Sequence, residues 1–171
     1  TTAQHVYDQL QGKIPYILDG GPCRVGVEST IVGFEEDEIF IYRLGGLTLE
    51  DIRKVAPHCH LKSNNSSNPI APGMLKSHYA PKHPFYLGEI NSLIKQFAGR
   101  RIGVLSFDKK YADVEFVKVN EILSADGNLD AAAVKLFSAM RVLDASLVDV
   151  IVGEYVPDLG IGRAINVRLK R

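Results

Sequence analysis

Apolar positions along residues 84–171 alternate between two spacings. Short apolar runs, typical of buried strands, occupy Phe85 to Leu87, Ile102 to Phe107, Val114 to Val119 and Val148 to Val152. Apolar residues at the three- and four-residue spacing of a helix occupy 90–97, 133–143 and 161–169. Strands that alternate with helices predict a mostly parallel sheet covered by helices, so we expect a small Rossmann-like, three-layer α/β domain here.

The first 57 residues follow a different pattern. Helical spacing predicts a helix over 3–10 and a second one that begins after Thr48. Three strands are predicted, at Tyr16 to Asp19, Glu28 to Phe34 and Ile39 to Tyr42. The acidic run 35–38 separates the last two strands and therefore predicts an antiparallel hairpin. These elements are too few to close a core of their own.

A polar segment separates these two patterns. Residues 62–69 are rich in Ser, Asn and Lys, and the prolines and glycine of 69–81 follow without an apolar period. We interpret 58–83 as an interdomain linker, and it is longer than most connections, which is typical of functional loops. The predicted division of the chain is therefore 1–57, 58–83 and 84–171.

Composition narrows the functional classes. Of 171 residues, 46% are hydrophobic and 23% are charged, as in ordinary folded domains. Basic and acidic residues number 20 each, so no overall positive field draws the chain to RNA or to an acidic membrane. No apolar run approaches the roughly 20 residues that span a bilayer. Cys23 and Cys59 form no paired motif, which favours a reduced, cytoplasmic protein without membrane contact.

Three stretches contain residue types that bind anions or substrates. Gly20 to Thr30 is a glycine-rich loop that ends in two hydroxyl side chains, and both its amides and its hydroxyls can bind oxyanions. Arg43 stands at a strand end beside two glycines, and its forked donors suit a phosphate. The stretch 71–81 places Met, His and Tyr between prolines. Taken singly, the first stretch is better explained by a hairpin turn and the second by a surface arginine. The third is also explained by a linker packed on its own domains.

Other chemistry has weaker support in the sequence. His58, Cys59 and His60 could bind a metal, but no second ligand pair follows at the spacing of a zinc site, so we expect no metal centre. No nucleophile with its partner base can be inferred from spacing, and we assign no catalytic residue.

Together and in this order, the stretches resemble the threonylcarbamoyl-AMP synthases, two-domain YrdC-like proteins with an extra C-terminal domain. The matching residues are Gly20-Gly21, Glu28 to Val32, Arg43 to Thr48, Pro72 to Met74, His78 to Pro81, Leu136 to Asp144, Asp149 to Ile151 and Gly160 to Leu169. The resemblance covers essentially the whole chain, and the linker motif is its most specific part. It implies that 1–57 are the C-terminal remainder of a YrdC-like catalytic domain.

The resemblance implies an enzyme that makes L-threonylcarbamoyladenylate from L-threonine, bicarbonate and ATP, with Mg²⁺ accompanying the ATP. The amine of threonine is carboxylated, the carbamate attacks the α-phosphate, and pyrophosphate leaves. Positioning and charge neutralisation carry this chemistry, without a protein nucleophile. The product passes to transfer machinery that modifies the adenosine beside the tRNA anticodon, so any contact with tRNA is expected to be indirect or weak.

The same resemblance implies roles for four residues. Ser29 matches the serine that contacts threonine, and Arg43 matches the arginine that contacts ATP. His78 and Tyr79 match linker residues that fold over the catalytic cavity. The Lys-x-Arg and Ser-x-Asn motifs of full-length members lie upstream of the matched region, so we expect this chain to begin inside a longer protein and to be inactive alone. Leu44 replaces the usual proline of the family, and Ser77 stands in a part of the linker that is often more basic.

Two alternatives remain from the sequence. One is a non-catalytic nucleotide- or RNA-binding module, which a true start at residue 1 would favour. The other is a flavodoxin-like binding domain over 84–171, which predicts a bound cofactor and gives 71–81 no role.

Tyr79 is predicted to act as a lid that excludes water from the labile adenylate. Tyr79→Ala in the full-length protein should lower the adenylate yield by about tenfold or more, the effect of about 1.4 kcal/mol, with the fold intact. Steady-state rates with a melting curve as control measure this. Equal rates and equal melting temperatures for the unsubstituted protein and the variant would mean that Tyr79 only packs and is not a lid.

Overall fold

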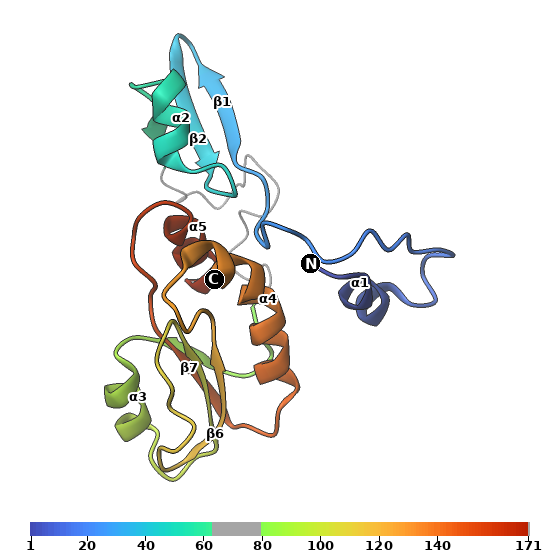
Figure 1. Cartoon of the computed structure of the whole chain (residues 1–171), viewed down its shortest axis with the longest axis vertical. Helices are drawn as coiled ribbons and strands as arrows, with labels where there is room; N and C mark the ends of the chain where they lie inside the picture. Colours follow the sequence, from blue (N-terminus) through green and yellow to red (C-terminus); the bar gives the residue numbers. More distant parts are fainter. Residues whose placement is uncertain (63–79, 171) are drawn as a thin grey trace.

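A four-stranded parallel sheet forms the centre of the C-terminal part (Figure 1). The computed structural model describes residues 1–62 and 80–170. The sheet has the order β4-β7-β5-β6. Its strands are β4 (Phe85–Leu87), β5 (Ile102–Ser106), β6 (Val117–Ile122) and β7 (Val150–Gly153). All pairings between these strands are parallel, so the predicted α/β class with a mostly parallel sheet is confirmed.

Helices cover both faces of this sheet, as the alternation of strands and helices predicted (Figure 1). They are α3 (Ile90–Gln96), α4 (Leu129–Ala145) and α5 (Gly162–Leu169). Side chains satisfy the first amides of two of these helices: Asn128 accepts from Ala131 at the start of α4, and Glu89 accepts from Asn91 and Ser92 at the start of α3. Helices α4 and α5 pack on one face and α3 on the other.

The two central strands explain why the apolar runs are continuous. Every residue of β5 and β7 is buried, because both faces of a parallel sheet are covered. Side chains alternate between the faces: Leu105 and Ile151 join the α4–α5 core, whereas Val104 and Val152 join the α3 core.

The N-terminal part forms a smaller sheet. Strands β1 (Ile31–Glu35) and β2 (Glu38–Arg43) make the predicted antiparallel hairpin. A short strand that the sequence did not predict, β3 (His60–Leu61), adds a parallel partner to β2. Helix α2 (Leu49–Val55) begins after its capping residue Thr48, as predicted, and packs in a small core with Ile41.

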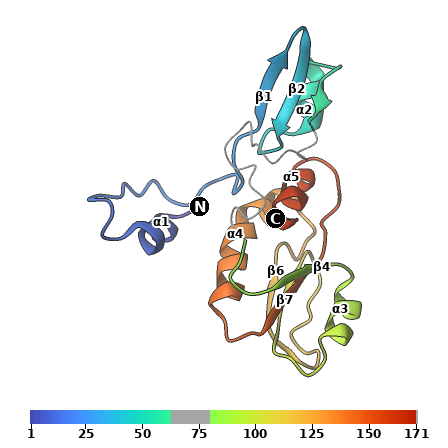
Figure 2. The same cartoon turned by 180° about the vertical axis from the view of Figure 1, so that it is seen from behind.

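The N-terminal segment lies apart from both sheets (Figure 2). Helix α1 (Ala3–Leu10) forms where predicted but buries no residue. The strand predicted at Tyr16 to Asp19 is wrong: within the described residues this segment pairs with no strand, and Leu18 is 99% exposed. A strand needs a neighbour for its backbone bonds, and an apolar run by itself does not supply one.

The starts of β6 and β1 lie further along the chain than the pattern predicted. Strand β6 begins three residues after the predicted start at Val114, because Val117 bonds back to Val114 in a turn and Phe116 takes a positive φ of 71°. Strand β1 begins at Ile31 and not at Glu28, because residues 28–30 contact other parts of the chain. The domain limits at 57/58 and 83/84 stay a prediction. In the part of the chain that the structure describes, no helix is long and apolar enough to cross a membrane.

The α4–α5 core is expected to dominate the stability of the C-terminal part. Leu136 is 0% exposed in this core, so Leu136→Ala should lower the free energy of unfolding by about 2–5 kcal/mol through lost burial and a cavity. Val142 lies on the same helix but is 46% exposed, so Val142→Ala should change it by less than about 0.5 kcal/mol. Urea unfolding followed by circular dichroism compares the two variants, and equal losses would contradict this assignment of the core.

Candidate functional site

The hairpin brings Ser29 and Arg43 together, although they are 14 positions apart. Arg43 is the last residue of β2 and lies opposite Ile31 in the ladder, two positions after Ser29. Its Nε donates to the Ser29 carbonyl oxygen at 3.0 Å, and its Nη2 donates to Ser29 Oγ at 3.2 Å. Ser29 is exposed and Arg43 half-buried, so a hydroxyl and a guanidinium meet where solvent reaches them.

The two segments that carry these residues touch along their backbones. Gly46 donates its amide to the Glu28 carbonyl at 2.9 Å, and the Thr30 hydroxyl donates to the Leu47 carbonyl at 2.5 Å. Gly45 lies so close to this backbone that a Cβ atom there would come within 2.2 Å of the Glu28 oxygen. Only glycine allows this approach. The close contact between the two backbones therefore explains the glycine at position 45, two residues after Arg43.

A buried ion pair joins these segments to the C-terminal part. Arg168 of α5 donates from Nε and Nη2 to Glu28 Oε2, at 2.9 and 2.6 Å. Its Nη1 donates to the Leu44 carbonyl at 2.6 Å and to the Ala164 carbonyl at 3.0 Å. Burial alone would raise the pKa of the Glu28 carboxyl, but the charge and hydrogen bonds of Arg168 outweigh it, and the pKa lies below its ordinary value. Glu28 is therefore ionised at neutral pH.

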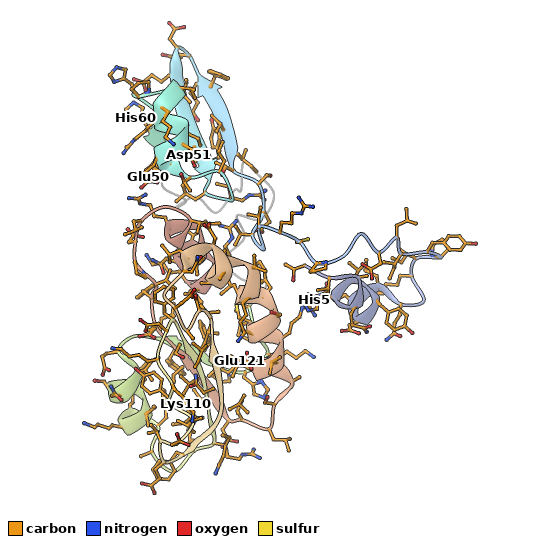
Figure 3. The ribbon with its side chains drawn as sticks, in the orientation of Figure 1. His5, Glu50, Asp51, His60, Lys110 and Glu121 are labelled. Carbon is orange, nitrogen blue, oxygen red and sulfur yellow. The ribbon has the colours of Figure 1, made fainter. Side chains whose placement is uncertain are left out.

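A second ion pair crosses the same boundary further out. Glu50, which Figure 3 labels on α2 at the end nearer to the C-terminal part, pairs with Arg163 and accepts from the Gly160 amide. Half of the Glu50 side chain is exposed, so this pair is more accessible than the pair between Glu28 and Arg168.

Apolar contacts accompany the ion pairs. Val27 and Leu44 pack against the α4–α5 core. Gly26, at a φ of 77°, lies against α4, and a Cβ atom there would come within 2.2 Å of the Ala133 carbonyl oxygen. The residues just before Ser29 are thus packed on the C-terminal part.

The other sequence candidates lie elsewhere. In the glycine-rich loop the Gly21 amide bonds to the Asp19 carboxylate at 2.8 Å, so that amide is already used within the loop. Cys59 is buried in the small core, and Cys23 is exposed; both are free thiols. His60 packs its ring against Phe40. Within residues 1–62 and 80–170, no three His, Cys, Asp or Glu side chains gather in a metal-binding arrangement.

His78 and Tyr79 lie outside the described residues, but both flanks of that stretch are anchored. On one side the Lys62 ammonium bonds to both oxygens of Glu35 at 2.5 Å. On the other side Asp144 of α4 accepts from the amides of Lys82 and His83, at 2.6 and 3.1 Å.

Two family comparisons match consecutive parts of the chain. Residues 47–171 match the family described as "Threonylcarbamoyl-AMP synthase, C-terminal domain", and residues 1–45 match the family described as "Telomere recombination". The chain belongs to the threonylcarbamoyl-AMP synthase family. The resemblance read from its motifs is thereby confirmed.

Curated relatives carry the same name. The threonylcarbamoyl-AMP synthase of Bacillus subtilis strain 168 is 38% identical over 181 residues, which cover 100% of this chain and 52% of the relative. The protein of that name from Pyrococcus abyssi is 35% identical over 188 residues, covering 100% of this chain and 53% of the relative. The chain thus spans about half the length of these family members.

Solved structures of family members agree with the fold. The crystal structure of P. abyssi Sua5 complexed with L-threonine has a TM-score of 0.87 at 35% identity, over 99% of this chain and 52% of that chain. A variant of the same protein, with an adjacent histidine and tyrosine both changed to alanine, has a TM-score of 0.85 at 34% identity and covers the same shares.

Sequence reasoning singled out Ser29 and Arg43, and the structure brings them into contact, but their roles toward threonine and ATP stay predictions. It gave Glu28 and Arg168 no role beyond their place in the family motifs. A signal existed: Arg168 lies four positions after Ala164 on the apolar stripe of α5, where a charged residue is unusual unless it is paired.

Glu28→Gln should lower the free energy of unfolding by an amount that depends on pH. Because the pKa of Glu28 is lowered in the folded chain, its stabilisation is complete above the ordinary glutamate pKa and is lost as pH falls through the lowered value. At pH 7 the variant should lose about 1–3 kcal/mol of unfolding free energy, the contribution of a charged hydrogen bond. Below about pH 4 the difference from the unsubstituted chain should shrink.

Urea unfolding at several pH values measures this, with Glu115→Gln, an exposed loop carboxylate, as the matched control. A difference that stays constant with pH would mean that Glu28 stabilises by packing and not by charge.

Proposed function

We propose that this chain supplies the C-terminal half of a threonylcarbamoyl-AMP synthase, which makes L-threonylcarbamoyladenylate from L-threonine, bicarbonate and ATP. In this proposal the enzyme is a nucleotidyltransferase: the carbamate of threonine attacks the α-phosphate of ATP, and pyrophosphate leaves.

The contact between Ser29 and Arg43 carries the proposal. If Ser29 binds threonine and Arg43 binds ATP, the 3.2 Å hydrogen bond between Arg43 Nη2 and Ser29 Oγ supports a site in which the two substrates lie side by side. Adenylate formation requires this arrangement, because the carbamate oxygen must reach phosphorus in line with the leaving pyrophosphate. The guanidinium would also offset the charge that develops on the phosphate oxygens.

Family membership supports the same chemistry. Relatives named threonylcarbamoyl-AMP synthase align with all of this chain, and a family member of the same fold has been crystallised with L-threonine. The Ser29 hydroxyl is exposed, as a threonine contact requires.

Mg²⁺ enters the proposal only with ATP. Among the described residues no three acidic, His or Cys side chains converge, and the proposal assigns the ion no protein ligand in this part of the chain. The ion would be ligated chiefly by phosphate oxygens and water, which is usual for Mg²⁺ with nucleotides.

The remaining assignments follow from the family. His78 and Tyr79 would cover the cavity, and downstream transfer machinery would carry the threonylcarbamoyl group to tRNA, with little direct tRNA contact. The free thiols of Cys23 and Cys59 fit the reducing cytoplasm, where we place the enzyme.

Complementation tests the proposal. The chain would be joined behind the N-terminal half of the B. subtilis relative, and pyrophosphate release from ATP would be measured with and without threonine and bicarbonate. The joined protein should release pyrophosphate only with both substrates, and this chain alone should release none. ATP binding by the joined protein without threonine-dependent release would favour the non-catalytic nucleotide-binding module.

Within the joined protein, Ser29→Ala should raise the KM for threonine by about tenfold, the effect of one substrate hydrogen bond. Arg43→Gln should raise the KM for ATP by at least as much, because a charged contact is lost. Arg53→Gln, an exposed arginine of α2, is the control and should change neither constant. Unchanged KM values in the first two variants would show that Ser29 and Arg43 do not bind threonine and ATP.

A further inference from the structure

Arg168 is the least exposed charged side chain at the boundary between the two parts of the chain. Its side chain is 1% exposed, yet it lies on α5, at the end of the C-terminal domain nearer to the hairpin (Figure 1). The partners it reaches across the boundary, the Glu28 carboxylate and the Leu44 carbonyl, are 140 and 124 positions away in the chain.

These partners are the immediate neighbours of the two predicted substrate residues. Glu28 precedes Ser29, and Leu44 follows Arg43. One guanidinium therefore holds both segments at once, with Nε and Nη2 on Glu28 and Nη1 on Leu44. Because a guanidinium is planar and rigid, its two bonded edges fix the distance between the segments.

We propose that Arg168 is a positioning residue, through which the C-terminal domain holds Ser29 and Arg43 in the arrangement that binds threonine and ATP. The proposal rests on the proposed function of that site. It gives the C-terminal domain a part in catalysis that does not require Arg168 to touch a substrate.

Stability alone does not account for a charge at this place. A buried ion pair recovers little more than its own desolvation cost, and apolar residues of similar size often serve the fold equally well. The surroundings are already apolar, since Val27 and Leu44 pack on the same core. What an apolar residue cannot do is bond a carboxylate and a carbonyl on two different segments at fixed angles.

The same helix provides a matched control. Arg163 also reaches across the boundary, but its partner is Glu50 on α2, and neither residue adjoins Ser29 or Arg43. Arg163→Lys and Arg168→Lys each keep a positive charge and remove a forked donor. The first variant loses contacts to Glu50, and the second loses contacts to the segments of Glu28 and Leu44.

The first measurement uses this chain by itself. In Arg168→Lys, amide hydrogen exchange should become at least about tenfold faster at residues 28–30 and 44–46, including the Gly46 amide that bonds to Glu28. Exchange in α4 should stay unchanged, and Arg163→Lys should leave 28–30 and 44–46 as they were. Unchanged exchange at 28–30 and 44–46 in a folded Arg168→Lys chain would overturn the proposal.

The second measurement uses the joined protein of the complementation assay. A loss of folded enzyme lowers the maximal rate and leaves KM unchanged, whereas displaced binding residues change KM. Arg168→Lys should raise the KM for both threonine and ATP by about tenfold, and Arg163→Lys should not. A lower maximal rate with unchanged KM values would assign Arg168 a structural role only.

Two safeguards separate the possible failures. If Arg168→Lys does not fold, Glu28→Gln, which has nearly the same shape as the original residue, replaces it with the same readouts and the same criteria. If the unsubstituted joined protein shows no threonine-dependent pyrophosphate release, the proposed function fails. The exchange measurement then still decides whether Arg168 orders the Ser29 and Arg43 segments.

Discussion

A buried guanidinium must have its charge balanced and its N–H groups bonded, and in this chain that requirement fixes how the two parts meet. Arg168 satisfies it with Glu28 and with the carbonyls of Leu44 and Ala164. To reach them, the segment before β1 must lie against α4 and α5, so close that position 26 tolerates only glycine. The glycines near the site therefore serve close packing between backbones, and a phosphate-binding loop is not needed to explain them.

The distribution of apolar burial shows why the boundary matters. The C-terminal sheet has a core on each face, whereas the hairpin and α2 share a cluster of four buried residues, and α1 buries none. Ser29 and Arg43 belong to the weakly buried part. A small core orders its own edges poorly, because local opening is least costly where few apolar contacts are lost. The contacts that α5 and the α4–α5 core make with the hairpin segments add to the few apolar contacts of the small core.

Local patterns predicted most of the helices and the parallel sheet, because periodicity reports directly which face of an element is buried. The same signal failed at Tyr16 to Asp19, where an apolar run stays exposed, since the pattern cannot say whether a pairing partner exists. Strand β3 is two residues long and leaves no periodic trace. The Ser29–Arg43 pair followed from the hairpin and the family motifs. The partner of Arg168 could not be predicted, because a pair 140 positions apart has no local signature beyond an arginine on an apolar stripe.

The demands of adenylate chemistry explain why such a pair would be useful at this point. Two bound substrates react only if the attacking oxygen and the phosphorus stay within a narrow distance, and a displacement of about 1 Å can cost about a hundredfold in rate. The hydrogen bonds between Ser29 and Arg43 keep the two residues together, and the bonds from Gly46 to Glu28 and from Thr30 to Leu47 align their segments. The bonds from Arg168 to Glu28 and Leu44 add a further constraint from a domain with a large core. In this proposal the placement of Ser29 and Arg43 depends on the part of the chain with the larger core, while the Ser29 side chain stays exposed to solvent.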